Sequence, residues 1–184
     1  GAGLDHLNGG LSGGTFPVGT TTVTWMATDA VNNTRTCAFS ITVNDTQAPN
    51  LTCPANRSIA TSTGLCTSST TYAPTVSDNC GGTPTLSYSF SGATTLSPWS
   101  SGTGSGGTFN KGITTVTLRA TDGAGLTRTC TFRVIVNDTE RPVIPACPTM
   151  APVNTAPGLC YATVSYVNPT FTDNCAPTSG TSVR

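Results

Sequence analysis

Eight cysteines are the residues of this chain with the clearest capacity for chemistry, and they recur at regular intervals. They are Cys37, Cys53, Cys66, Cys80, Cys130, Cys147, Cys160 and Cys175. No Cys-x-x-Cys pair occurs and His6 is the only histidine, so the ligand spacing of a zinc site is absent. An even, dispersed set of cysteines indicates structural disulfides formed in an oxidising compartment. We therefore expect an extracellular or cell-surface protein.

Acidic side chains form a second group, because only eight are present and six of these occupy three repeated places. The six are Asp29, Asp45, Asp78, Asp122, Asp138 and Asp173. Carboxylates that gather with backbone carbonyls would make an oxygen-rich site suited to Ca²⁺. The alternative is that each aspartate only accepts hydrogen bonds from the backbone of its own turn.

Both groups belong to an internal repeat of about 93 residues. The segment 22–39 matches 115–132 at a spacing of 93 residues, and 64–80 matches 158–175 at a spacing of 94 to 95. Self-similarity at a fixed period is the signature of a repeat architecture. The chain is therefore expected to contain one fold several times over.

The repeat divides the chain into one complete unit and two halves. We predict that residues 1–46 are the C-terminal half of one repeat, 47–139 a complete repeat, and 140–184 the N-terminal half of the next. Residue 184 followed by residue 1 of a second unit would make a further repeat, so we expect a polymer of copies. The chain either passes onward in a long array, or separate subunits complete each other by exchanging strands. A truncated fragment with ragged ends is the alternative.

Composition excludes several classes of function. Charged residues make up 9% of the chain and the formal net charge is zero, against about 25% charged residues in an ordinary domain. Such a chain does not attract nucleic acid or an anionic membrane over a distance, and no apolar run approaches the ~20 residues of a membrane span. His6 has no partner nucleophile and no phosphate-binding loop is present, so we predict that the protein is not an enzyme.

Alternating apolar and β-branched residues predict short strands and almost no helix. The expected strands are 50–53, 57–61, 67–73, 85–90, 113–120 and 128–137. The Gly/Ser-rich segment 91–112 is expected to be a long loop, in which Trp99 caps the sandwich edge or a neighbouring domain, or serves as a ligand platform. Several short strands in about 92 residues favour an all-β fold of tandem immunoglobulin-like β-sandwich domains.

The motifs of each repeat resemble those of the hyalin repeat, or HYR domain. They are a proline followed by Cys-Pro, Gly-Leu-Cys, Asp-Asn-Cys, Gly-x-Thr-Thr-Val-Thr (19–24, 112–117), Ala-Thr-Asp (27–29, 120–122) and Thr-Cys-x-Phe. The resemblance covers nearly the whole chain and departs mainly in the elongated Gly/Ser loop. It implies an immunoglobulin-like fold and a role in extracellular adhesion or matrix structure, without fixing a ligand.

An immunoglobulin-like topology makes the candidate sites more definite. Asp45, Asp78 and Asp122 should converge at one joint between domains, as should Asp138, Asp173 and the Asp29 of a following copy, each group as a candidate Ca²⁺ site. Four cysteines per repeat allow three pairings. We predict Cys53–Cys80 with Cys66–Cys130, and Cys147–Cys175 with Cys160 bonded to Cys37 of the next copy.

Two functions follow from these expectations. The first is a structural subunit of an extracellular filament or fibre, built from tandem disulfide-bonded domains and serving adhesion or matrix cohesion. Its partners would be copies of itself. The second is a surface adhesin whose loops 91–112 and 1–19 bind a glycan or a protein on another surface.

Overall fold

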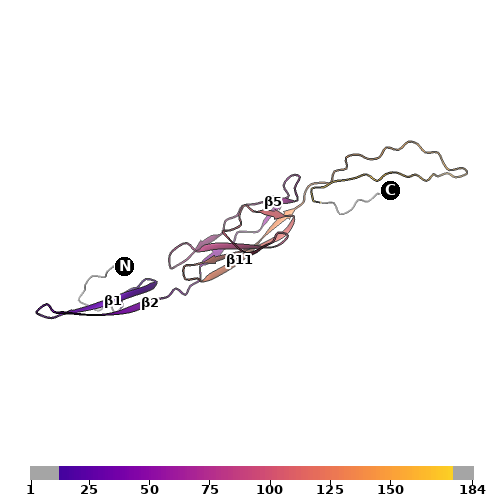
Figure 1. The fold of residues 1–184 in the computed structure, drawn as a ribbon. Coiled ribbons are helices and arrows are strands. Elements are labelled where there is room, and N and C mark those ends of the chain that lie inside the picture. Colours follow the sequence, from indigo (N-terminus) through magenta and orange to yellow (C-terminus); the bar gives the residue numbers. More distant parts are fainter. Residues whose placement is uncertain (1–12, 176–184) are drawn as a thin grey trace.

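The computed structural model describes residues 13–175, and within them the regular structure consists of strands alone. The expectation of an all-β chain is confirmed. Three parts follow one another along an elongated molecule (Figure 1): a hairpin, a central unit and an extended C-terminal segment. Within this range no helix has the length and apolar character that a membrane crossing requires.

The central unit is built on a five-stranded sheet with the order β4-β11-β10-β7-β8. Its strands are β4 (Arg57–Ala60), β7 (Thr85–Gly92), β8 (Leu96–Ser101), β10 (Gly112–Thr121) and β11 (Thr127–Asn137). Two small antiparallel pairs complete the unit. They are β3 (Asn50–Thr52) with β6 (Thr75–Ser77), and β5 (Thr67–Ser69) with β9 (Thr108–Asn110).

The core of this unit follows the period-two pattern of β10. Thr114, Val116, Leu118 and Ala120 are fully buried, whereas the intervening side chains remain partly exposed. Apolar residues of other strands join them, among them Phe109, Phe132, Val134, Val136 and Tyr72. Because successive side chains of a strand point to opposite faces, one face of the hairpin β10–β11 supplies most of the core.

Tyr72 ties the core to the Gly/Ser-rich segment. Its ring meets that of Phe132 edge to face with the centroids 4.7 Å apart, and its hydroxyl donates a hydrogen bond to the carbonyl of Thr103 at 3.0 Å. Burial, followed by the proximity of Tyr88, raises the pKa of Tyr72 well above its ordinary value of 10.0. The neutral phenol is therefore the form that the folded protein accommodates.

This raised pKa predicts a loss of stability in alkaline solution. Above about pH 10 the tyrosine of the unfolded chain ionises while Tyr72 of the folded chain stays neutral, so stability falls by up to about 1.4 kcal/mol per pH unit. Below pH 10 the contribution is fully present. We expect Tyr72→Phe to remove this part of the pH dependence, measured by denaturant unfolding between pH 9 and pH 11. Identical slopes for the two proteins would contradict the assignment.

The prediction that segment 91–112 is a long loop is wrong, because the segment contains two strands. It contributes β8 to the edge of the main sheet and β9 to the pair with β5. Gly104 has a φ of 74° and lies so close to the rings of Tyr88 and Phe90 that a Cβ would clash with both. The run of Gly and Ser hid these strands because so few apolar residues mark their alternation. Elsewhere β6 was not expected, and β5 ends at residue 69 rather than 73.

The hairpin preceding the central unit lacks the rest of a sandwich. It pairs β1 (Gly19–Thr28) with β2 (Thr34–Val43) in the same register as β10 with β11, since Trp25 lies opposite Cys37 as Leu118 lies opposite Cys130. The C-terminal segment, residues 140–175, has one isolated bridge between Val143 and Thr172. Each flanking part therefore resembles half of the central unit in sequence, and its described residues (13–46 and 140–175) form no sandwich core of their own.

Candidate functional site

One disulfide joins the β3–β6 pair to the five-stranded sheet within the central unit. Cys53, just after β3, bonds to Cys130 on β11, with their Cα atoms 5.8 Å apart, and both lie against the hydrophobic core. The predicted pairs Cys53–Cys80 and Cys66–Cys130 are therefore wrong. Sequence order suggested that 53 and 80 share a pole, but Cys80 lies beside Asp45 at the joint with the preceding hairpin.

A second disulfide joins the central unit to the segment that follows it. Cys66, in the turn before β5, bonds to Cys175 across 109 residues of sequence, with a Cα–Cα distance of 4.8 Å. The predicted pair Cys147–Cys175 is therefore wrong in this structure. Sequence reasoning assumed that each repeat bonds within itself, whereas the turn at Cys66 faces the next repeat.

Polar contacts surround this inter-repeat disulfide. The backbone N–H of Gly64 donates to both carboxylate oxygens of Glu140, at 2.9 and 3.1 Å. The amide nitrogen of Asn174 donates to the carbonyl of Leu65 at 2.8 Å. Sequence reasoning missed both Glu140 and Asn174; their place beside the cysteine motifs was the available signal. We call this set the staple: Gly64, Leu65, Cys66, Glu140, Asn174 and Cys175.

The other four cysteines carry free thiols on exposed residues: Cys37, Cys80, Cys147 and Cys160. Two of them are the repeat equivalents of the bonded pair Cys53–Cys130, because Cys147 matches Cys53 and Cys37 matches Cys130. The expectation that these four form disulfides as well stays a prediction. The particular pair of Cys160 with Cys37 of the next copy has no counterpart in the structure, because the repeat equivalents Cys66 and Cys130 are not bonded to each other.

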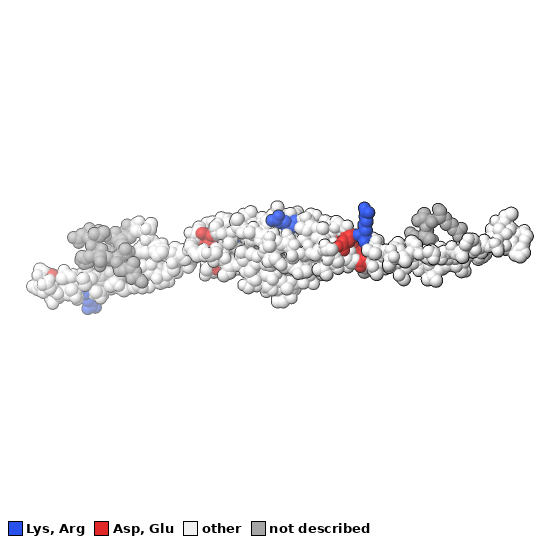
Figure 2. Space-filling view, turned by 90° about the horizontal axis from the view of Figure 1, so that it is seen from above, with Lys and Arg blue, Asp and Glu red and all other residues white. Residues whose placement is uncertain are grey.

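Acidic groups gather at the two ends of the central unit, on a surface that otherwise carries few charges (Figure 2). At the joint with the hairpin, carboxylate oxygens of Asp45 and Asp78 and the sulfur of Cys80 lie within 4.8 Å of one another. They line a depression of about 260 Å³ together with Gly123 and Ala124. These two residues follow Asp122 in its turn, but the carboxylate of Asp122 is not among the ligand atoms that lie within 4.8 Å of one another. The convergence of all three aspartates at this joint stays a prediction.

Each of these aspartates uses one oxygen to hold its own turn. Asp45 accepts the N–H of Gln47 at 3.1 Å, Asp78 that of Cys80 at 2.9 Å, and Asp122 those of Ala124 and Leu126, both at 2.9 Å. Oδ1 of Asp78 and Oδ2 of Asp122 are buried without a hydrogen-bond partner. The turn-forming role is therefore real, and it leaves buried carboxylate oxygens unsatisfied.

The electrostatics of this joint are reflected in the thiol of Cys80. Local burial of the sulfur, and then the neighbouring carboxylates of Asp45, Asp78 and Asp122, raise the pKa of the Cys80 thiol. A thiolate there would add a fourth negative charge to the cluster. The joint thus disfavours a reduced, ionised cysteine and favours a neutral sulfur species.

The joint at the other end has a different charge balance. Asp138 and Asp173 lie within 4.8 Å of the sulfur of Cys175, which is already in the staple disulfide. Asp138 also forms an ion pair with the ammonium of Lys111 at 3.1 Å. The repeat equivalent of Lys111 at the first joint is Val18, so the first joint has no lysine at this position.

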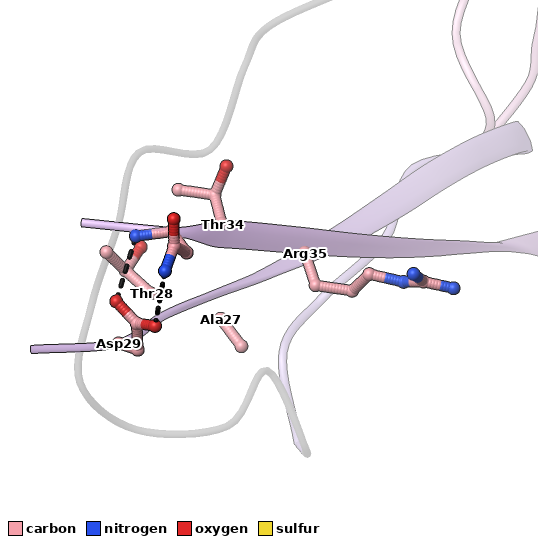
Figure 3. A pocket seen from close by; sticks show the side chains of 6 residues that line it. Ala27, Thr28, Asp29, Thr34 and Arg35 are labelled. Carbon is pink, nitrogen blue, oxygen red and sulfur yellow. Dashed lines mark hydrogen bonds between the residues drawn. The ribbon is translucent and has the colours of Figure 1, made fainter. Parts of the chain in front are cut away.

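Asp29, the sixth predicted ligand, lies in the turn of the β1–β2 hairpin, at its end away from the central unit (Figures 1 and 3). Its carboxylate accepts hydrogen bonds from the backbone of Val31 and from the backbone and side chain of Asn33, all at 2.9 Å. These bonds, chiefly the one from the Asn33 side chain, lower the pKa of Asp29. A single chain does not bring Asp29 to Asp138 and Asp173.

Trp99, which the sequence left as either an edge cap or a ligand platform, lies on edge strand β8. The guanidinium of Arg119 stands over its ring, 4.5 Å from the centroid. A cation in this position covers one face of the indole. Trp99 is therefore engaged on its own sheet.

These features define a class of protein: an all-β chain of repeated units held by disulfides. The chain belongs to the HYR domain family, whose profile matches residues 7–43 and 44–136. The family is a non-enzymatic, adhesion-type one. Among curated proteins the chain is similar to "Hyalin" of Strongylocentrotus purpuratus, with 31% identity over 167 residues. This match covers 88% of the chain and 13% of that protein.

Proposed function

We propose that this protein is a structural subunit of an extracellular filament, in which HYR domains succeed one another and serve adhesion or matrix cohesion. The observation that carries the proposal is the face of the β1–β2 hairpin. Trp25 is 47% exposed and Phe39 49% exposed, although their equivalents in the complete repeat, Leu118 and Phe132, are 0% and 4% exposed. Apolar faces of this kind mark sites of association.

The occupant that fits this face is segment 140–184 of another copy, whether it arrives along a continuing chain or from a separate subunit. Tyr166 is the repeat equivalent of Tyr72 and is 54% exposed, whereas Tyr72 is 6% exposed against Phe132. Phe39 is the equivalent of Phe132. In the completed domain Tyr166 of one copy would therefore lie on Phe39 of the next, as Tyr72 lies on Phe132.

The mechanism of such a filament is mechanical. Chain continuity or strand exchange transmits tension from domain to domain. The Cys53–Cys130 bond limits extension within a domain, and the staple limits bending between domains, because it adds a second covalent link beside the linker residues 138–142. Low charge leaves little repulsion between neighbouring domains.

The experiment that tests the proposal follows assembly of the purified chain. We expect sedimentation velocity to show species that grow with protein concentration, and electron microscopy to show beaded fibres with one uniform spacing. A chain that stays monomeric across the accessible concentration range, with its hairpin face exposed, would contradict the proposal.

The first joint adds a site for a divalent cation to this filament. Asp45 and Asp78 lie within 4.8 Å of each other, and Asp122 begins the turn that lines the same depression. Asp78 and Asp122 each have a buried oxygen without a hydrogen-bond partner, and Asp122 is only 9% exposed. Hard oxygen ligands of this kind are those of Ca²⁺, while a neutral sulfur at Cys80 is a poor ligand for it. A bound Ca²⁺ would bind the buried oxygens and hold the turn between β10 and β11 against the linker between β2 and β3. Lys111 makes the second joint less suitable.

Calcium removal is expected to lower the stability of the complete repeat. At a Ca²⁺ concentration one hundred times the dissociation constant, the folded state gains about 2.7 kcal/mol, so adding a chelator should lower the melting temperature by several degrees. The matched control is Asp78→Asn, which should melt at the same temperature with and without Ca²⁺. A wild-type chain whose melting ignores both Ca²⁺ and chelator would rule out this site.

The adhesin alternative depends on free loops. It would use segment 91–112, but this segment forms β8 and β9 and its Trp99 lies under Arg119. Its second loop, 1–19, lies mostly outside the described residues. No feature of the described part of the chain favours a glycan or a surface protein over a further copy, so the filament remains our proposal.

A further inference from the structure

We infer that Cys80 and Cys160 are two halves of one disulfide, formed between Cys160 of one copy and Cys80 of the copy that follows it. This inference rests on the proposed filament, because the two cysteines face each other only when consecutive copies share a completed domain. It assigns a covalent link to every joint of the assembly, including the joints between copies.

The template for this bond is the staple of the single chain. Cys66 ends the motif Gly-Leu-Cys of one repeat and Cys175 ends the motif Asp-Asn-Cys of the next. They bond across the joint with a Cα–Cα distance of 4.8 Å, which lies within the range that a disulfide spans. Cys160 ends the next Gly-Leu-Cys motif along the chain, and Cys80 ends the preceding Asp-Asn-Cys motif.

The turn that carries Cys160 already has the conformation of the bonded turn. In the staple, the N–H of Ser62 donates to Thr67 at 2.8 Å and that of Leu65 to Ser62 at 2.9 Å. At the second copy of the turn, the N–H of Ala156 donates to Tyr161 and that of Leu159 to Ala156, both at 3.0 Å. The glycines before the cysteines match as well, because Gly64 has a φ of 72° and Gly158 one of 77°.

The turn that carries Cys80 matches the other side of the staple. The N–H of Cys175 donates to Asp173 at 2.8 Å, and the N–H of Cys80 donates to Asp78 at 2.9 Å. An aspartate of the linker between repeats lies beside each cysteine, Asp138 beside Cys175 and Asp45 beside Cys80. The turns that carry Cys80 and Cys160 therefore already have the conformations of the bonded turns. They differ from the staple in that both cysteines have free thiols.

The linkers that set the geometry of the two joints also agree. Asp-Thr and a proline three residues after the threonine stand at 45–49 and at 138–142. Glu140, which receives the N–H of Gly64, is replaced by Gln47, whose side-chain carbonyl can accept the N–H of Gly158. A glutamine also avoids a further negative charge beside Asp45 and Asp78, at the joint that lacks a lysine.

Formation of the bond is an oxidation and needs an oxidant. A small-molecule disulfide of the glutathione class is a suitable oxidant. The thiolate of one cysteine attacks it and releases one small thiol, which leaves a mixed disulfide. The thiolate of the second cysteine then attacks the mixed disulfide and displaces the other small thiol. Two protein thiols are oxidised to one disulfide, and the small disulfide is reduced to two thiols. Electrons and protons balance without any group of the protein as cofactor.

The experiment uses the full chain assembled from isotopically labelled and unlabelled protein in a glutathione redox buffer, then alkylated, digested with a protease that cuts before aspartate, and examined by mass spectrometry. This digestion separates Cys80 from all other cysteines. We expect mixed-label peptides that link Cys80 to Cys160, and a ladder of covalent oligomers on a non-reducing gel. Alkylated Cys80 in assembled fibres, or Cys80 bonded elsewhere, would overturn the inference.

A matched set of variants separates this link from one between Cys37 and Cys147, the equivalents of the intra-repeat pair. Cys37→Ser with Cys147→Ser should keep the ladder, and adding Cys80→Ser should reduce it to monomer on the gel. Fibres seen by electron microscopy without the Cys80–Cys160 link overturn this inference and leave the filament standing. If wild-type protein forms no fibres, the proposed function fails and the inference with it.

Discussion

Trp25→Asp is expected to abolish assembly of copies while the central repeat stays folded. Trp25 lies on the open face of the β1–β2 hairpin, at the place where the complete repeat has the fully buried Leu118. Loss of a large buried aromatic residue costs about 3–5 kcal/mol, which weakens association by at least two orders of magnitude. Burial of an unpaired carboxylate adds to this cost. Sedimentation velocity should show the monomer at every concentration where the wild-type chain is polymeric.

The neighbouring residue provides the matched control. Met26 points to the opposite face of the same strand, and its repeat equivalent is the charged Arg119. Met26→Asp introduces the same charge one residue away and should leave assembly nearly intact. Equal effects of the two variants would show that charge on the hairpin, rather than its apolar face, governs association. Both proteins should keep the melting temperature of the central repeat, because neither position belongs to its core.

The second large effect is expected from removing the disulfide within the central repeat. Cys53→Ala with Cys130→Ala opens a loop of 77 residues, for which the chain-entropy relation gives a loss of about 4–5 kcal/mol in the free energy of unfolding. A domain has about 5–15 kcal/mol in total, so this variant should be close to unfolding at room temperature. Denaturant titration followed by circular dichroism measures the loss.

The staple provides a control whose loop is longer still. Cys66→Ala with Cys175→Ala opens 109 residues, so loop length alone predicts an equal or greater loss. The structure predicts a small one for the central repeat, because the staple ties it to a segment with no sandwich core and both ends of the core remain bonded through Cys53–Cys130. What this variant should lose is the fixed angle at the joint, visible as a shorter and more variable end-to-end distance by X-ray scattering. Equal destabilisation by the two double variants would contradict this division of roles.

The local pattern of the chain determined the fold class and the repeat. The alternation at 113–120 places every second side chain of β10 in the core, and this holds wherever apolar and hydroxyl residues alternate clearly. The pattern did not reveal β8 and β9, where Ser and Gly dominate. Their strand character comes from neighbours in space, since Gly104 must lie against Tyr88 and Phe90, and no local propensity encodes that contact.

The aspartates of the candidate site were likewise predictable only in part. Their places at turns and beside cysteines predicted that Asp45, Asp78 and Asp122 would meet, and the structure brings Asp45 and Asp78 together beside Cys80. Which joint carries a compensating cation was not visible. Lys111 and Val18 occupy equivalent positions of the repeat, and only the folded chain shows that this position faces the aspartate of the linker.

The sequence by itself determined that this protein is a run of β-sandwich repeats with cysteines at fixed positions, because strand periodicity and motif spacing are local properties. Only the tertiary structure decided which cysteines bond. A disulfide requires two Cα atoms within about 7 Å, and chain order does not say which pole of a sandwich each turn reaches. The pairing of Cys66 with Cys175 follows from the packing of one repeat against the next, so the link between repeats emerged when their arrangement in space was known.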